Sequence, residues 1–102
     1  MQRLHNKVAI VTGAAGGMGA SVAHLFAEQG ALVLATDIQF EKMNAWVQES
    51  RKHSLAIECI RHDVGSESDW KSVVEKALHL YAKIDILINN AGVYQPMETT
   101  EA

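Results

Sequence analysis

The sequence is short of cysteine and of long apolar runs. Its 102 residues include one cysteine, Cys59, so no disulfide can form within the chain, which is typical of a reducing compartment. No stretch approaches the ~20 apolar residues of a membrane-spanning helix. The first residues lead into only a short apolar run, too short for a secretory signal. We therefore expect a cytoplasmic protein.

Clustered positive charge and metal-binding spacings are also missing. The formal net charge is −3 and no basic run stands out, so neither a nucleic acid nor an anionic membrane is indicated as a partner. None of the five histidines is spaced i, i+4 from another, and Cys59 with His62 lacks the other ligands of a zinc site. We expect no metal site, surface or hydrogen-bonded histidines, and a Cys59 that packs as a small hydrophobe.

What the chain does contain is a regular alternation of apolar runs and amphipathic segments. The pattern predicts strands at 7–12, 31–36, 55–60 and 84–88, and helices at 17–29, 40–53 and 66–81. Short connections between alternating strands and helices indicate an α/β fold with a parallel sheet. Right-handed crossovers give the strand order 3-2-1-4 with helices on both faces. We expect one domain over residues 1–102.

Each predicted helix carries an apolar stripe that should face the sheet. The expected stripes are Met18, Val22, Leu25 and Phe26; then Met43, Trp46 and Val47; then Trp70, Val73, Val74, Ala77, Leu78 and Tyr81. On the second helix, charged residues such as Glu41 and Lys42 are expected in solvent. Ser66 with Asp69 resembles a capping box in which aspartate replaces the usual glutamate.

A glycine-rich loop joins the first strand to the first helix. Thr12-Gly13-Ala14-Ala15-Gly16-Gly17-Met18-Gly19 lies between the apolar run 8–11 and an amphipathic segment, the context in which a glycine motif indicates dinucleotide binding. Glycine lets a phosphate approach the main chain closely, and the helix N-terminus directs free N–H groups at the same place. The loop therefore predicts a pyrophosphate site.

Acidic residues follow the second and third strands. Asp37 is placed to accept hydrogen bonds from both hydroxyls of the adenosine ribose; the alternative is a turn aspartate that caps the next helix. Its carboxylate would repel a 2′-phosphate, and no arginine stands at Gly16 or directly after Asp37, so NAD is favoured over NADP. Asp63 and Val64 are placed to bind adenine; the alternative is a loop aspartate near a helix start.

These motifs together resemble the short-chain dehydrogenase/reductase family. Members carry Thr-Gly-x3-Gly-x-Gly after the first strand and Asn-Asn-Ala-Gly after the fourth, here residues 12–19 and 89–92. The resemblance covers nearly the whole chain and implies a Rossmann-type fold truncated relative to the family. It implies these cofactor contacts: Gly13, Gly16, Gly17 and Met18 at the pyrophosphate and adenosine ribose; Asp37 and Ile38 at the adenine ribose; Asp63 and Val64 at the adenine; Asn90, Ala91 and Gly92 at the ribose and against the first strand.

The resemblance also implies that the catalytic half of the family is missing from this chain. Family members use a serine, a tyrosine and a lysine four residues after the tyrosine. Here Asp85 stands four residues after Tyr81, and Glu98 stands four after Tyr94. No catalytic residue can be assigned, and we expect this chain alone to be inactive.

The leading interpretation is thus the cofactor-binding portion of an NAD-dependent oxidoreductase that transfers hydride to or from a ketone or secondary alcohol. One alternative is a non-catalytic nucleotide-binding or interaction module. A second is an S-adenosylmethionine methyltransferase, against which the Thr-Gly-x3-Gly-x-Gly spacing argues. The apolar strand 84–88 would be an open edge, so self-association is expected.

Overall fold

The computed structural model describes residues 3–90, which form seven elements in alternating order. These are β1 (Val8–Thr12), α1 (Gly17–Glu28), β2 (Leu32–Asp37), α2 (Phe40–Arg51), β3 (Ile57–Arg61), α3 (Glu67–Tyr81) and β4 (Ile86–Ile88). The longest, α3, has 15 residues, and no helix of the described part is long and apolar enough to cross a membrane.

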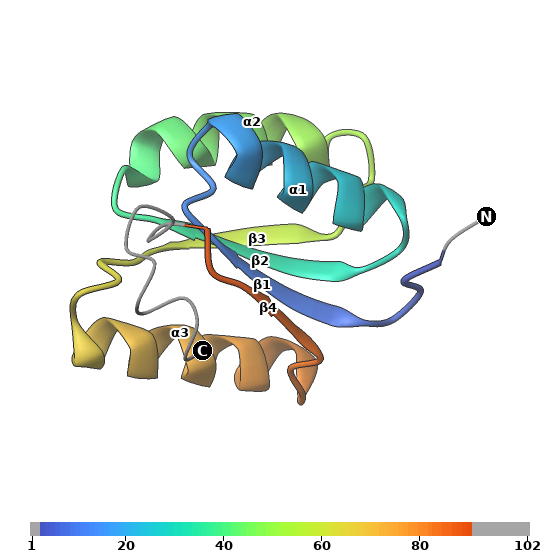
Figure 1. Cartoon of the computed structure of the whole chain (residues 1–102). Helices are drawn as coiled ribbons and strands as arrows, with labels where there is room; N and C mark the ends of the chain where they lie inside the picture. Colours follow the sequence, from blue (N-terminus) through green and yellow to red (C-terminus); the bar gives the residue numbers. More distant parts are fainter. Residues whose placement is uncertain (1–2, 91–102) are drawn as a thin grey trace.

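The four strands form one parallel sheet in the order β3-β2-β1-β4. The chain moves outward from β1 through β2 to β3 and then returns through α3 to place β4 on the other side of β1. Helices α1 and α2 cover one face of the sheet and α3 covers the other (Figure 1). The predicted strand order and the predicted two-sided helix cover are therefore confirmed.

The two central strands of the sheet are almost completely buried from solvent. Every residue of β1 is buried, and so are the four interior residues of β2. Strands covered on both faces need continuous apolar runs rather than alternating ones, which explains the two unbroken runs in the sequence. Both strands end in threonine or aspartate, so polar atoms begin where the covering layers end.

The stripe predicted for α1 is wrong in part. Met18 and Leu25 are 70% and 52% exposed, whereas Gly19, Ala23 and Ala27 are the buried residues of this helix. The buried set follows the spacing i, i+4, i+8, so it lies on a single line along the helix. Small residues on that line let the helix backbone lie close to the sheet, and the larger side chains are displaced to its flanks.

The stripe predicted for α3 is also only half buried. Val73 and Ala77 pack with Ile10 and Leu34 in the core of that face. Val74 and Leu78 are 37% and 47% exposed, because the apolar stripe of α3 is wider than its contact with the central strands in the described part of the chain.

All seven elements lie where they were predicted, but each differs from its predicted range by one or two residues at one or both ends. All four strands begin one or two residues later than predicted, and α2 ends at Arg51 rather than near residue 53. Beyond α2 the chain leaves helical geometry at Ser54, whose φ is 68°. Of the two predicted residues that β4 lacks, Ile84 and Asp85, the second contributes its side chain to the sheet edge instead of extending the strand.

Asp85 fastens the start of β4 to the start of β1. Its N–H donates to the Val8 carbonyl at 2.9 Å, and its Oδ2 accepts from the Val8 N–H at 2.8 Å. Lys83 Nζ lies 3.1 Å from the same oxygen. The hydrogen bond from Val8, followed by the interaction with Lys83, lowers the pKa of Asp85 below its ordinary value.

The lowered pKa predicts an acid-sensitive contribution to stability. A carboxyl whose pKa is lowered by folding stabilises the fold above its unfolded-state pKa, about 3.9 for aspartate, and this stabilisation is lost as the pH falls through the folded-state pKa. Asp85→Asn should therefore flatten the acid limb of the unfolding free energy against pH, measured by urea denaturation. Glu75→Gln, at an exposed position on α3, is the control, and an acid limb equally steep in Asp85→Asn and wild type would contradict the assignment.

Candidate functional site

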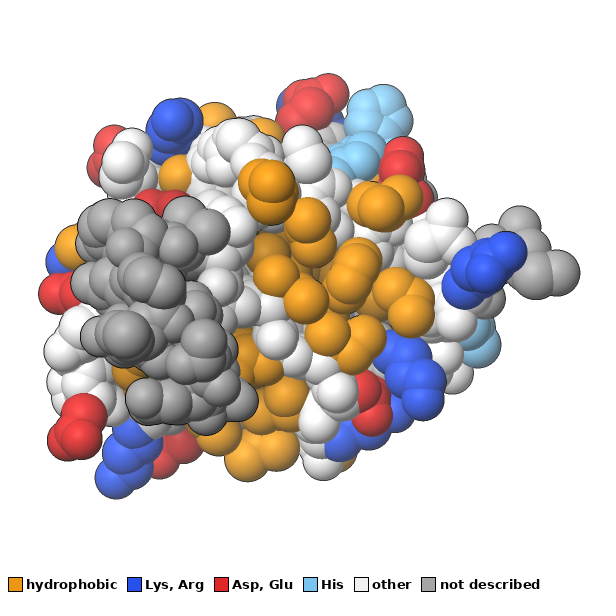
Figure 2. All heavy atoms as spheres, in the orientation of Figure 1, with side chains coloured by type: hydrophobic (Ala, Val, Ile, Leu, Met, Phe, Trp, Pro, Cys, Tyr) orange, Lys and Arg blue, Asp and Glu red, His pale blue; other side chains and the backbone are white. Residues whose placement is uncertain are grey.

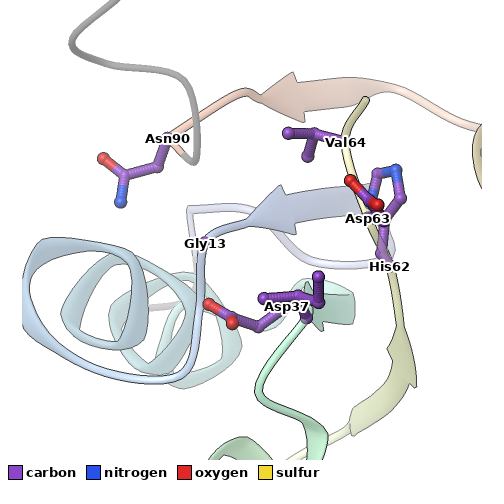
Figure 3. A pocket seen from close by; sticks show the side chains of 7 residues that line it. Gly13, Asp37, His62, Asp63, Val64 and Asn90 are labelled. Carbon is purple, nitrogen blue, oxygen red and sulfur yellow. The ribbon is translucent and has the colours of Figure 1, made fainter. Parts of the chain in front are cut away.

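The carboxyl ends of the four strands open into one pocket. Its volume is ≈ 350 Å³, and its lining residues are Gly13, Asp37, Ile38, His62, Asp63, Val64 and Asn90. Figure 3 shows the Gly13 loop in the middle, Asn90 on one side, and His62 and Asp63 on the other. All of the lining residues except His62 stand among the residues predicted from the sequence. The topology brings them together, because parallel strands end at the same edge of the sheet.

The glycine loop leaves the start of α1 free to receive an anion. Gly13 and Gly17 have φ values of 66° and 59°, a region that residues with a Cβ rarely adopt. Among residues 3–90 no side chain caps the N-terminus of α1, and its first turn holds no acidic residue. The unpaired N–H groups and the positive end of the helix dipole are therefore unopposed, an arrangement suited to phosphate.

The helix reaches this position only because residue 19 is glycine. A Cβ added at Gly19 would lie 2.0 Å from the Gly13 carbonyl oxygen and 2.9 Å from Asn90 Nδ2. The contact with Gly13 is with backbone, which cannot move aside without remodelling the turn. Gly19 thus fixes the distance between α1, the turn after β1 and the end of β4.

Asp37 holds two segments of main chain with one carboxylate. Its Oδ2 accepts from the Ala15 N–H at 3.0 Å, and its Oδ1 accepts from the Gln39 N–H at 2.7 Å. The second bond is the helix-start role considered as the alternative, since Gln39 is the N-cap of α2. The first ties the end of β2 to the glycine loop. Each oxygen keeps a lone pair for a further donor, so both roles are compatible.

The loop after β3 is stabilised by the N-terminal turn of α3. Ser66 Oγ accepts from the Asp69 N–H at 3.1 Å, as the capping prediction required. In a capping box the Asp69 side chain would accept from the Ser66 N–H. Here Asp69 Oδ2 accepts from the Asp63 N–H at 2.8 Å. Asp63 Oδ1 accepts from the Gly65 N–H at 2.9 Å, which is the turn role weighed for this residue.

His62 is the lining residue that the sequence did not predict. It is 1% exposed, its Nδ1 lies 2.9 Å from Thr36 Oγ1, and its Nε2 has no hydrogen-bond partner in the described part. Burial lowers its pKa, against a smaller opposite effect of Asp69 and Asp63, so the ring is neutral at neutral pH. Its position directly before Asp63 at the end of an apolar strand is the one sequence signal that could have identified it.

Two tryptophans predicted as core residues also hold the pocket loops. Trp46 Nε1 donates to the Ala14 carbonyl at 2.8 Å, and Trp70 Nε1 donates to the Val64 carbonyl at 2.9 Å. The Trp70 ring also meets His62 edge-on at 4.2 Å between centroids. Both side chains are half-buried. A helical stripe in a sequence cannot reveal which carbonyl an indole N–H reaches, so this role was missed.

Thr12 joins the end of β1 to the end of β4. Its Oγ1 accepts from the Asn90 N–H at 2.9 Å and lies 3.0 Å from Asn89 Oδ1, to which it can donate. Asn90 thereby lies beside the glycine turn. The predicted contacts Ala91 and Gly92 lie outside the described residues.

The remaining predicted residues lie around the pocket or away from it. Gly16, Gly17 and Met18 belong to the same loop and first helical turn but do not line the pocket. Tyr81 lies elsewhere: its hydroxyl is 3.4 Å from the carbonyl of Val33, near the opposite end of β2, and burial raises its pKa to about 12. Among residues 3–90, no three His, Cys, Asp or Glu side chains gather as a metal site.

Comparison with known proteins identifies the family of this chain. The family model described as short chain dehydrogenase matches residues 7–102. The chain is 40% identical over 91 residues to the 3-oxoacyl-acyl-carrier-protein reductase of Thermotoga maritima, covering 89% of this chain and 37% of that protein. It is 39% identical over 94 residues to tropinone reductase-like 1 of Erythroxylum coca, covering 92% of this chain and 34% of that protein.

Solved structures agree with the sequence relatives. A hydroxysteroid dehydrogenase from Escherichia coli superposes with a TM-score of 0.84 at 37% identity, over 89% of this chain and 39% of that one. A short chain dehydrogenase/reductase from Burkholderia phymatum in complex with NAD has a TM-score of 0.80 at 25% identity, over 85% of this chain and 31% of that one. The chain thus spans between 30% and 40% of the length of these relatives.

The close approach at Gly19 predicts an intolerant position. Gly19→Ala should lower the free energy of unfolding by about 2–3 kcal/mol, because the new methyl group meets backbone that cannot repack. Gly65→Ala is the matched control, since a Cβ there would meet only Asp63 Oδ1 at 3.4 Å, and it should stay within about 0.5 kcal/mol of wild type. Equal effects of the two substitutions in urea denaturation would contradict this account of the loop.

Proposed function

The chain belongs to the short-chain dehydrogenase family, and from that premise we propose that its pocket is the cofactor site of an NAD-dependent oxidoreductase. The observation that carries the proposal is the convergence of the glycine loop, Asp37, Asp63 and Asn90 on one pocket. The bound dinucleotide would supply the hydride acceptor or donor. The substrate class we propose is a ketone or secondary alcohol. Family membership argues against the methyltransferase alternative.

Each part of the pocket would take a different part of the dinucleotide. The free N–H groups at the start of α1 would hold the pyrophosphate. Asp37 and Ile38 would hold the adenosine ribose, and Asp63 and Val64 the adenine. Asn90, with Ala91 and Gly92, would contact the second ribose. Gly16, Gly17 and Met18 would shape the pyrophosphate turn.

Asp37 supports the choice of NAD. A carboxylate that accepts hydrogen bonds from ribose hydroxyls would repel a 2′-phosphate in the same place, at a cost on the order of 1–4 kcal/mol for a close like-charge contact. The N–H bonds from Ala15 and Gln39 fix this carboxylate in position. A fixed group cannot turn away from the phosphate, so the repulsion is not easily relieved.

We propose catalysis only for a protein with the full length of the family's members, and not for these 102 residues alone. Within residues 3–90 no tyrosine has a lysine four residues later, and Tyr81 is held protonated by burial. We expect this chain alone to bind nucleotide weakly and not to turn over. The rival function is a non-catalytic nucleotide-binding or interaction module.

Two measurements on the natural protein test the proposal: its intact mass and its binding of NADH. NADH should bind in preference to NADPH. Asp37→Ala should weaken the affinity for NADH by about tenfold, because charge-assisted hydrogen bonds to the ribose are lost. Glu41→Ala, on the adjacent turn of α2, should bind as wild type. A mass near 11.2 kDa with no change in NADH fluorescence would favour the non-catalytic module.

The β4 edge suggests self-association of the 102-residue chain. β4 pairs with β1 on one side, no described strand lies on its other side, and Leu87 is 50% exposed. Figure 2 shows hydrophobic side chains gathered on the face that carries this edge and α1. Open apolar edges pair with other chains, and an edge lysine discourages this.

Size-exclusion chromatography with light scattering measures the effect. The 102-residue chain should run above its monomer mass, and Leu87→Lys should shift it toward the monomer. Leu80→Lys, which removes another exposed leucine from α3, is the control for general loss of hydrophobic surface. A wild-type monomer with a cooperative melting transition would refute the proposal.

A further inference from the structure

A lysine from α2 lies over the glycine loop at a place the sequence does not indicate. A Cβ built at Gly16 would be 3.2 Å from Lys42 Nζ and 3.3 Å from Lys42 Cε. The backbone of Gly16 is extended, with φ −168° and ψ −174°, so any residue could adopt its conformation. What glycine provides here is therefore space, and the ammonium group of Lys42 lies within reach of it.

Lys42 is free to interact with a ligand. Two other lysines of the described part pair with acids: Lys52 Nζ lies 3.6 Å from Glu49, and Lys83 Nζ lies 3.1 Å from Asp85. Among the lysines without an ion pair in the described part, Lys42 is the one whose ammonium group lies against the glycine loop. Lys42 has no carboxylate within ion-pair distance among residues 3–90 and makes no side-chain hydrogen bond there. Within the described part, its ammonium group is therefore available to a ligand beside the loop.

The two charges flank the same two residues of the loop. Asp37 Oδ2 accepts from the Ala15 N–H, and Lys42 Nζ lies over the next residue, Gly16. Asp37 and Lys42 form no ion pair with each other, so neither charge is neutralised by the other. A ribose that hydrogen-bonds to Asp37 would present its 2′ substituent to a carboxylate with an ammonium group close by.

We infer that Lys42 is a specificity-determining residue whose ammonium group faces the 2′ position of the adenosine ribose and makes the site tolerant of a 2′-phosphate. The inference rests on the proposed cofactor site and changes its expected selectivity. Asp37 still favours NAD, but the cation offsets part of its repulsion toward the phosphate. NADP is therefore bound measurably rather than excluded.

Removing the ammonium group should affect one dinucleotide far more than the other. In the natural protein, Lys42→Met should weaken the affinity for NADPH by about fivefold or more, as expected for loss of one charge pair at a partly hydrated site. NADH, which lacks the 2′-phosphate, should change less than twofold. The difference between wild type and variant should shrink as salt is added, because salt screens exposed charges.

Lys52→Met is the matched control, since Lys52 lies at the other end of α2 and pairs with Glu49; it should leave both affinities unchanged. Adenosine 2′-monophosphate, competing against NADH, provides a second probe and should compete less well with Lys42→Met than with wild type. The competition isolates the 2′ position from the pyrophosphate.

The outcomes separate this inference from the proposed function. If neither dinucleotide binds, the proposed function is wrong and the inference falls with it. If NADH binds but NADPH does not, the site excludes the 2′-phosphate and only the inference is overturned. If Lys42→Met weakens both dinucleotides equally, the lysine acts on the shared pyrophosphate or on the fold, which also overturns its role in specificity.

Discussion

The contact between Gly19 and the Gly13 carbonyl sets the geometry on which the pocket depends. It fixes how closely the start of α1 approaches the turn after β1, with only 2.0 Å between that oxygen and the place of a Cβ. The line of small buried residues continues through Ala23 and Ala27, so no large side chain on that line holds the helix away from the sheet. The glycine motif is therefore a packing constraint of the fold as well as a feature of phosphate binding.

Side chains from other elements then hold the loops around that contact. Trp46 and Trp70 donate to loop carbonyls, while Asp37 and Asp69 accept from loop N–H groups. Backbone groups at a loop are otherwise satisfied by water, and exchanging water for a fixed partner reduces the number of loop conformations. These bonds are made within the protein, and loops that are held in place in this way have less conformational freedom to lose when a ligand binds.

The sequence was sufficient for the architecture because its signals are local and repeated. The strand order follows from the alternation of elements and the handedness of crossovers, and the strand ends must then meet at one edge. Helix orientation was less predictable: a large apolar residue such as Leu25 suggested the buried face, yet Ala23 and Ala27 occupy it. Hydrophobicity identifies an apolar side of a helix, whereas the fit against the sheet depends on side-chain size.

The features that the sequence did not reveal are contacts between side chains and distant main chain. His62 lines the pocket, Trp46 donates to the Ala14 carbonyl and Lys42 lies against Gly16. No spacing rule specifies any of these three contacts. This limit bears directly on cofactor choice, because selectivity between two dinucleotides is a difference between two binding free energies. Asp37, which can be recognised from its place after a strand, favours the binding free energy of NAD. Lys42, which reaches the same loop from a helix, can change the binding free energy of NADP. A prediction of selectivity from sequence must therefore include every charge that can reach the ribose, wherever it lies in the chain.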